Sequence, residues 1–201
     1  MRWDRFFDDL EDQLASEWEA ERAALDTEAE RLRLSRVALR ERLQALTRRD
    51  AAGTPPTFEF TDGTILAAEV SGVGADWAAL QPLERRAAAL VVPLHGIGCV
   101  GVPHPDLLRS ARPAEEAGAL SDRMTFGFVL RDLVRRRTGV AVHLAHGRML
   151  TGTIDRAGLD HLDIALHDPG AARRSDAVTG HRVVPFPAIS WIRVDAASVL
   201  A

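Results

Sequence analysis

An internal repeat constrains the fold of this chain more strongly than any other feature of its sequence. The segment 57–102 recurs in a longer form as the segment 140–194. Gly63 aligns with Gly147 at an offset of 84 residues, and beyond a polar loop the offset becomes 92 residues. Further aligned pairs are Leu66 and Leu150, Val70 and Ile154, Gly74 and Gly158, Asp76 and Asp160, Ile97 and Ile189, and Val91-Val92-Pro93 with Val183-Val184-Pro185. A repeat of this length predicts two similar structural units.

Short apolar segments separated by turn residues predict five strands in each unit. Asp62-Gly63 lies between two such segments, and this dipeptide is a hairpin signal. We expect a helix before each set of strands. The arginine-rich segment that ends near Arg49 supplies the first helix, and the second is expected to be capped by Ser121 and to stop at Gly139.

The N-terminal region is predicted to be helical, because residues 3–49 contain neither glycine nor proline. Its apolar residues recur at spacings of three, four and seven, which indicates a coiled coil or a long packed helix. A helical hairpin is the alternative, because Thr27 to Glu30 reads as a capping box that could begin a second helix. The apolar stripe consists of Trp3, Phe7, Leu10, Leu14, Trp18, Leu25, Leu32 and Leu39. We expect it to pair with a second copy, to bind a partner helix, or to fold back on the chain.

Composition divides the chain into four regions. They are a helical arm over 1–50, a first stranded unit over 55–103, a linker over 104–120, and a helix with a second stranded unit over 121–195. Two prolines mark the first boundary, and a stretch rich in proline, alanine, glutamate and arginine marks the linker. The predicted fold class is therefore α+β.

Charge and cysteine usage limit the classes of partner. All 25 basic residues are arginine, and the formal net charge is −4. Acidic residues dominate the segment 1–30 and arginines the segment 31–50, so general attraction to nucleic acid is not indicated, although a local patch could act. No apolar run approaches the roughly 18 residues of a membrane span. The single cysteine, Cys99, is predicted to be a small core residue and fits a reducing compartment, so we expect a cytoplasmic protein.

One stretch of the second unit carries a set of residues that is typical of a known family. The residues are Val142, Leu144, Gly147, Arg148, Leu150, Gly152 and Ile154, then 161–166, then 183–186 with Ala188, Ile189 and Ile192. This pattern resembles the Sm-like family and the related Src-homology-3-like small barrels. The resemblance implies that a helix caps a strongly bent five-stranded barrel in each unit. The chain would then be a helical or coiled-coil arm followed by two Sm-like five-stranded small β-barrels, the second preceded by its own helix.

The resemblance also implies an RNA-base pocket, which the family builds from an Asp, an Asn and an Arg-Gly pair. In this chain Asp163 stands at the Asn position, and the nearest acid of the first signature is Asp160. The Arg-Gly pair is replaced by Pro185-Phe186. A carboxylate repels phosphate and lacks the donor group of an amide. These departures weigh against RNA binding in the manner of the family.

We predict no catalytic residue, no cofactor and no metal site. His143 and His146 are three residues apart on a strand, so their side chains should point to opposite faces. The strongest polar candidate is an arginine patch, because a guanidinium binds phosphates and carboxylates with two parallel hydrogen bonds. The patch consists of Arg131, Arg135, Arg136, Arg137, Arg148, Arg173 and Arg174.

We therefore expect a non-enzymatic interaction or assembly module, an adaptor that binds a protein partner or itself through the N-terminal arm. The alternative is an RNA- or DNA-binding regulatory protein that uses the arginine patch on the second helix and the second barrel. A membrane is not an expected partner.

Overall fold

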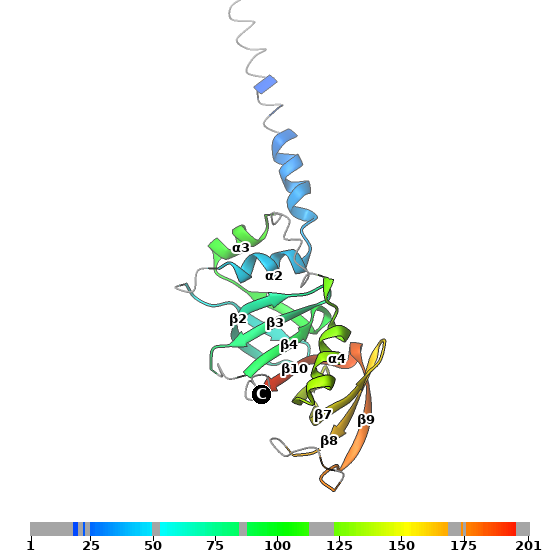
Figure 1. Cartoon of the computed structure of the whole chain (residues 1–201). Helices are drawn as coiled ribbons and strands as arrows, with labels where there is room; N and C mark the ends of the chain where they lie inside the picture. Colours follow the sequence, from blue (N-terminus) through cyan, green and yellow to red (C-terminus); the bar gives the residue numbers. More distant parts are fainter. Residues whose placement is uncertain are drawn as a thin grey trace, which may run out of the picture.

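The strands of this chain form one open antiparallel sheet (Figure 1). The computed structural model describes residues 18–19, 22, 25–49, 53–84, 88–112, 123–168, 174 and 176–195. The strands of the first half are β1 (Thr57–Phe60), β2 (Ile65–Val73), β3 (Trp77–Pro82), β4 (Ala88–Pro93) and β5 (Ile97–Gly101). Those of the second half are β6 (Gly139–Leu144), β7 (Met149–Ala157), β8 (His161–Leu166), β9 (Gly180–Pro185) and β10 (Ile189–Asp195).

The two halves of the sheet have the same internal order. The strands follow one another as β5-β1-β2-β3-β4-β10-β6-β7-β8-β9, so each half places its fifth strand first and its fourth strand last. A single 3-10 turn follows the fourth strand of each half, η1 (Leu94–Gly96) after β4 and η3 (Phe186–Ala188) after β9. Gly63 and Gly147 both have a φ of 83°, a conformation in which a Cβ would be strained. The repeat in the sequence is therefore also a repeat in the backbone.

The predicted pair of separate Sm-like barrels behind a coiled-coil arm is wrong. β4, from the first half, pairs with β10, from the second half, and Val91 lies opposite Ile192. The other paired residues are Leu90 with Arg193, Ala89 with Val194 and Ala88 with Asp195. An unpaired strand edge leaves N–H and C=O groups without partners, so joining two edges satisfies both. The result is one ten-stranded sheet.

Each half has its own hydrophobic core, and each core includes one buried residue from the other half. The first core contains Phe58 and Phe60 and extends to Trp191 of β10. The second core contains Ile154 and extends to Val91 of β4. The two halves are therefore held together by exchanged side chains as well as by strand pairing.

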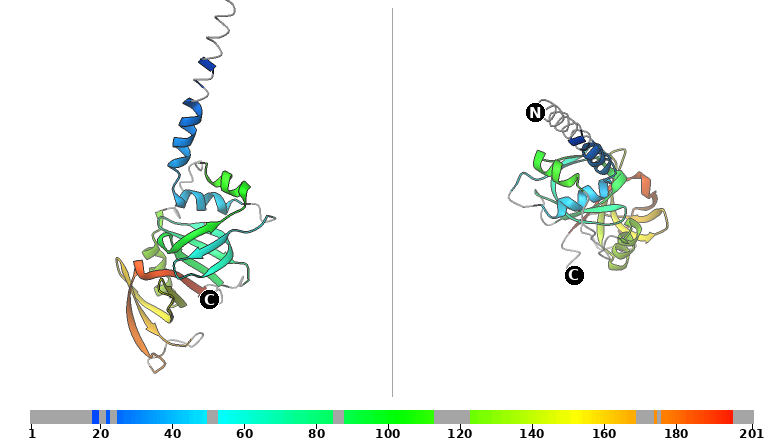
Figure 2. Two further views of the ribbon diagram at one scale, coloured as in Figure 1. Left: turned by 180° about the vertical axis from the view of Figure 1, so that it is seen from behind. Right: turned by 90° about the horizontal axis from the view of Figure 1, so that it is seen from above.

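Helices cover the sheet in corresponding places (Figures 1 and 2). Helix α2 (Leu39–Thr47) lies against β2, and helix α4 (Phe126–Arg136) lies against β7. Helix α3 (His104–Ser110) packs against α2, where Arg49 Nε lies 2.8 Å from Asp106 Oδ2. The segment predicted to be a linker, 104–120, therefore begins with a helix.

Helix α4 begins and ends at residues other than those that the sequence signals predict. Thr125 caps it, and its Oγ1 accepts a hydrogen bond from the Phe128 N–H at 3.3 Å. At the other end Arg137 adopts the left-handed conformation with a φ of 53°, so the helix stops before Gly139. Ser121, the predicted cap, lies outside the described residues.

The N-terminal helix is interrupted before α2 begins. Residues 25–35 are helical and extend away from the sheet in Figures 1 and 2. The Val37 N–H binds the Leu34 carbonyl, three residues earlier, and the Ser35 hydroxyl donates to the Leu32 carbonyl at 2.8 Å. A hydroxyl that binds nearby backbone competes with helical hydrogen bonds, which accounts for the end of the helix here.

The predicted apolar stripe is consequently not one surface. Leu25 and Leu32 are exposed on the N-terminal helix, whereas Leu39 begins α2 on the sheet. The alternative break at Thr27 is also wrong, because residues 25–35 are continuously helical. Trp3, Phe7, Leu10 and Leu14 lie outside the described residues.

Candidate interaction surfaces

The contact between the two halves shows which surfaces of the repeat bind each other. Val91 of β4 is only 7% exposed and shares a buried cluster with Phe126 and Leu130 of α4 and Ile192 of β10. Burial of a valine side chain contributes about 1.5–3 kcal/mol. We call the space between the helix and the fifth strand of a half its helix groove. In the second half, Val91 occupies this groove.

A turn of the first half binds the N-terminus of α4. The Ala75 N–H and the Trp77 indole N–H both donate to the Met124 carbonyl, each at 2.9 Å. Asp76 Oδ1 accepts a hydrogen bond from the Phe126 N–H at 2.6 Å. A carboxylate is favourable at this position because the first N–H groups of a helix lack partners within the helix. We call this turn, together with the fourth strand, the valine edge of a half.

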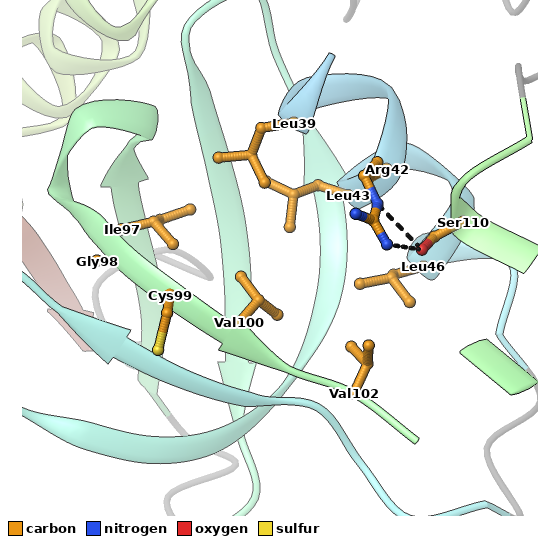
Figure 3. A pocket seen from close by; sticks show the side chains of 10 residues that line it. All are labelled: Leu39, Arg42, Leu43, Leu46, Ile97, Gly98, Cys99, Val100, Val102 and Ser110. Atoms are coloured by element: carbon orange, nitrogen blue, oxygen red, sulfur yellow. Dashed lines mark hydrogen bonds between the residues drawn. The ribbon is translucent and has the colours of Figure 1, made fainter. Parts of the chain in front are cut away.

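The helix groove of the first half is open (Figure 3). A pocket of about 220 Å³ lies between α2 and β5, and its residues are Leu39, Arg42, Leu43, Leu46, Ile97, Gly98, Cys99, Val100, Val102 and Ser110. Leu39 is 43% exposed, whereas Phe126, at the corresponding position of α4, is 2% exposed. Arg42 Nη2 donates to Ser110 Oγ at 3.2 Å and forms a polar rim. The groove is apolar, and none of the described residues fills it as Val91 fills its counterpart.

The two grooves are lined by corresponding residues. The pairs are Leu39 and Phe126, Leu43 and Leu130, Leu46 and Leu133, Ile97 and Ile189, Val100 and Ile192, and Val102 and Val194. All six members from the second half belong to the cluster that contains Val91. The first groove therefore shares six apolar positions with the second, but it has the polar rim of Arg42 and Ser110 and lacks the valine.

The valine edge of the second half is exposed. Val183, which corresponds to Val91, lies on β9 at the end of the sheet and is 69% exposed. In the turn before β8, Leu159 is 93% exposed. The Asp160 carboxylate in the same turn is also exposed, and its hydrogen bond from His161 Nδ1 at 2.8 Å lowers the pKa of the carboxyl. The buried Val91 of the first valine edge thus has an exposed counterpart, Val183, in the second.

Helix α2 lacks the N-terminal partners that α4 has. Thr125 and Asp76 both bind N–H groups in the first turn of α4. At the corresponding end of α2, Ala38 is the capping residue and has no side-chain oxygen to offer. The N-terminus of α2 is therefore suited to accept a carboxylate from outside.

A second set of contacts at the junction surrounds Trp191. Its indole N–H donates to Asp62 Oδ2 at 2.9 Å, and its ring lies 5.7 Å from the Phe60 ring. The His143 ring stacks on the indole with a centroid distance of 3.5 Å. Burial lowers the pKa of His143 to about 4, although the Asp62 charge acts in the opposite direction.

Cys99 corresponds to Trp191 in the repeat, but it is exposed. The predicted core position is therefore wrong, because β5 is an edge strand and this face of it is uncovered. The thiol donates to Glu59 Oε2 at 3.3 Å, and this hydrogen bond raises the pKa of Cys99. A thiol with a raised pKa is a weak nucleophile at neutral pH.

The predicted arginine patch carries less free charge than the sequence suggests. Arg135 and Arg136, on α4, both form ion pairs with Asp132 of the same helix. The exposed members are Arg131, Arg135, Arg136, Arg137, Arg148 and Arg174, and Arg173 lies outside the described residues. Ion pairs within one helix reduce the attraction of the patch for phosphate.

The part of the chain that the structure describes has no group of three His, Cys, Asp or Glu side chains that could hold a metal ion. His143 lies in β6 and His146 in the turn that follows it. Within the same described part, no helix combines the length and the apolar character needed to cross a membrane.

No family model matches this chain, and no curated protein is detectably similar to it in sequence. The resemblance to Sm-like proteins therefore stays a prediction.

Sequence reasoning did not single out Val183 and Asp160 as the counterparts of residues that bind the other half. The signal was present, because the repeat aligns them with Val91 and Asp76. The sequence does not show that Val91 and Asp76 bind the other half, because this depends on the long-range pairing of β4 with β10.

Proposed function

We propose that this chain is a non-enzymatic assembly module that binds a protein partner through its N-terminal helix. The observation that carries this proposal is the exposure of Leu25 and Leu32, which are 65% and 52% exposed on a helix that leaves the sheet. Their seven-residue spacing places both on one face. Burying each of these leucines under a partner contributes about 1.5–3 kcal/mol to the free energy of binding, which favours a partner helix on this face. We place the protein in the cytoplasm, because a single cysteine suits a reducing compartment.

The test compares two substitutions on the same helix. Leu32→Asp places a charge on the face that contains Leu25, whereas Leu34→Asp places the same charge on the opposite face, about 200° away. The protein is crosslinked in cells, and both the proteins and the nucleic acids attached to it are identified. We expect Leu32→Asp to lose the crosslinked protein and Leu34→Asp to keep it. Equal recovery with both variants would contradict the proposal.

Nucleic-acid binding through the arginine patch is the alternative function, and the Sm-like resemblance supports it. The ion pairs of Arg135 and Arg136 with Asp132 and the net charge of −4 favour the protein partner. Replacing Arg135, Arg136 and Arg137 with glutamine should leave the crosslinked proteins unchanged. If RNA or DNA is recovered, binds more weakly as salt rises and is lost in this variant, the alternative is favoured.

A further inference from the structure

We propose that copies of this chain associate head to tail through the two ends of the sheet. The valine edge of the second half of one copy binds the helix groove of the first half of the next copy. This inference rests on the proposed assembly role, but it uses surfaces that the helix 25–35 does not form. A second copy is the partner because the equivalent groove inside the chain is already filled by the chain's own repeat.

The strand pairing follows from the internal register. Val91 lies opposite Ile192 at the junction between β4 and β10. The counterparts of these two residues are Val183 on β9 and Val100 on β5, and of the described strands none pairs with the outer edge of either β9 or β5. Antiparallel pairing with Val183 opposite Val100 directs the valine side chain into the open pocket beside Leu39. Strand addition of this kind supplies hydrogen bonds to both free edges.

The turn before β8 supplies a second, independent contact. At the internal junction, Asp76 accepts a hydrogen bond from the first N–H of α4. Its counterpart Asp160 is exposed, and the counterpart of that N–H is the Leu39 N–H of α2, whose helix has no side-chain cap. Asp160 of one copy therefore fits the N-terminus of α2 in the next. Leu159, at 93% exposed, would be covered by the same contact.

The contact between copies should be weaker than the internal junction. β5 ends at Gly101, whereas β10 continues to Asp195, so fewer residues can pair. Cys99 also replaces Trp191, and a thiol cannot reproduce the contacts that Trp191 makes across the junction, which are the indole hydrogen bond to Asp62 and the ring contact with Phe60. The association is therefore reversible and depends on concentration.

A contact of this type joins two different surfaces, so each complex still has one free groove and one free valine edge. Further copies can be added, and the assembly either closes into a ring or continues as a filament. A symmetric pairing of two β9 edges or two β5 edges would instead stop at a dimer.

The test uses the full chain with Leu32→Asp already present, so that association through the N-terminal helix does not contribute. Val183→Arg blocks the valine edge, and the new arginine lies opposite Asp163, so β9 retains a favourable cross-strand pair. Leu39→Asp blocks the groove and repels Asp160. The matched control is Ile65→Arg, an exposed position opposite Glu59 whose counterpart Met149 is exposed away from the internal junction.

Sedimentation equilibrium over a wide concentration range is the measurement. We expect the reference chain and the Ile65→Arg variant to associate, and Val183→Arg and Leu39→Asp each to weaken association by at least about tenfold. Mixing Val183→Arg with Leu39→Asp should restore a one-to-one dimer and nothing larger. Each variant retains one intact surface, and these two surfaces are complementary.

Three results would overturn the inference. They are a reference chain that is monomeric at every concentration, undiminished association of Val183→Arg, and a mixture that does not dimerise. Association that disappears when Leu32→Asp is introduced would assign self-association to the helix alone. Because the crosslinking test uses the helix and this test uses the sheet, failure of either proposal is seen separately.

Discussion

The two helix grooves of this protein have closely related linings, but one is filled by a side chain of the other half and the other is open. The groove between α4 and β10 contains Val91, and Phe126 at its mouth is 2% exposed. The groove between α2 and β5 is open, and Leu39 at the same position is 43% exposed. Local sequence therefore builds both grooves, and the neighbouring half of the chain decides which of them is filled.

The junction residues beyond the grooves differ more. Trp191 of the second half binds Asp62 and stacks on His143, whereas its counterpart Cys99 binds Glu59 at an exposed edge. The internal junction therefore includes a specific hydrogen bond from Trp191 to Asp62 and an aromatic contact between Trp191 and Phe60. The outer surfaces retain the valine and the acidic turn without these contacts.

The largest expected effect is on stability, where equivalent substitutions in the two cores should differ. Leu130 and Leu43 occupy corresponding positions and are 0% and 1% exposed, but Leu130 shares its cluster with Val91 while Leu43 borders the open pocket. We expect Leu130→Ala to lower the free energy of unfolding by about 4 kcal/mol and Leu43→Ala by about 2–3 kcal/mol. Urea denaturation at low protein concentration measures both, with Leu34→Ala as the exposed control. An equal or larger loss for Leu43→Ala would mean that the first groove is packed as tightly as the second.

The second effect is the pH dependence that His143 gives to the junction. Its pKa in the folded chain is about 4, below the ordinary value of 6.5, chiefly because it is buried. Below about pH 6.5, His143 therefore binds a proton in the unfolded chain but stays neutral in the folded chain. The contribution of His143 to stability is constant above this pH and falls towards pH 4. The loss should be on the order of 3 kcal/mol.

His143→Phe, which keeps a ring against Trp191, should remove this part of the pH dependence in urea denaturation. Substituting the exposed His146 with phenylalanine serves as the control and should leave the pH dependence as it is. An unchanged slope between pH 6.5 and pH 4 in His143→Phe would show that the histidine is not buried in its neutral form.

The repeat and the turns could be predicted from the sequence, because they depend on local residues. Gly63 and Gly147 mark the same hairpin turn in both halves, and the strand segments follow at constant offsets. The joining of β4 to β10 could not be predicted, because apolar periodicity does not specify which edges pair. The exposure of Cys99 follows from that pairing, since it leaves β5 at the end of the sheet.

The helical region shows the same limit. Helix formers from residue 3 to residue 49 predict helix, either continuous or broken near Thr27. In the structure Leu43 and Leu46 pack on the sheet, and the helix ends before α2. This interruption separates Leu32 from Leu39, so the seven-residue series belongs to two different surfaces. Tertiary packing therefore overrides a strong local preference.

The smallest expected effect is a difference in stability between alanine substitutions in the two acidic turns, at Asp76 and at Asp160. Asp76→Ala removes a hydrogen bond to the N-terminus of α4 and should lower the free energy of unfolding by about 1 kcal/mol. Asp160→Ala should change it by less than about 0.5 kcal/mol in dilute solution, because this exposed carboxylate binds the adjacent His161 side chain and not a helix N-terminus. Both values come from urea denaturation. A loss for Asp160→Ala that equals the loss for Asp76→Ala, in a monomeric sample, would show that the second turn already has a partner within the chain.

Cysteine crosslinking between copies tests the central claim most directly, because it reports the register of the proposed contact. One chain carries Cys99→Ser and Val183→Cys, and the other carries Cys99→Ser and Val100→Cys. Opposed residues of antiparallel strands have Cα atoms about 4.5–5.5 Å apart, which a disulfide can bridge. After mild oxidation of the mixture, we expect a disulfide that joins position 183 of one chain to position 100 of the other, identified by mass spectrometry of the linked peptides. Linkage of position 183 to itself, or no linkage above that of either chain alone, would contradict head-to-tail association.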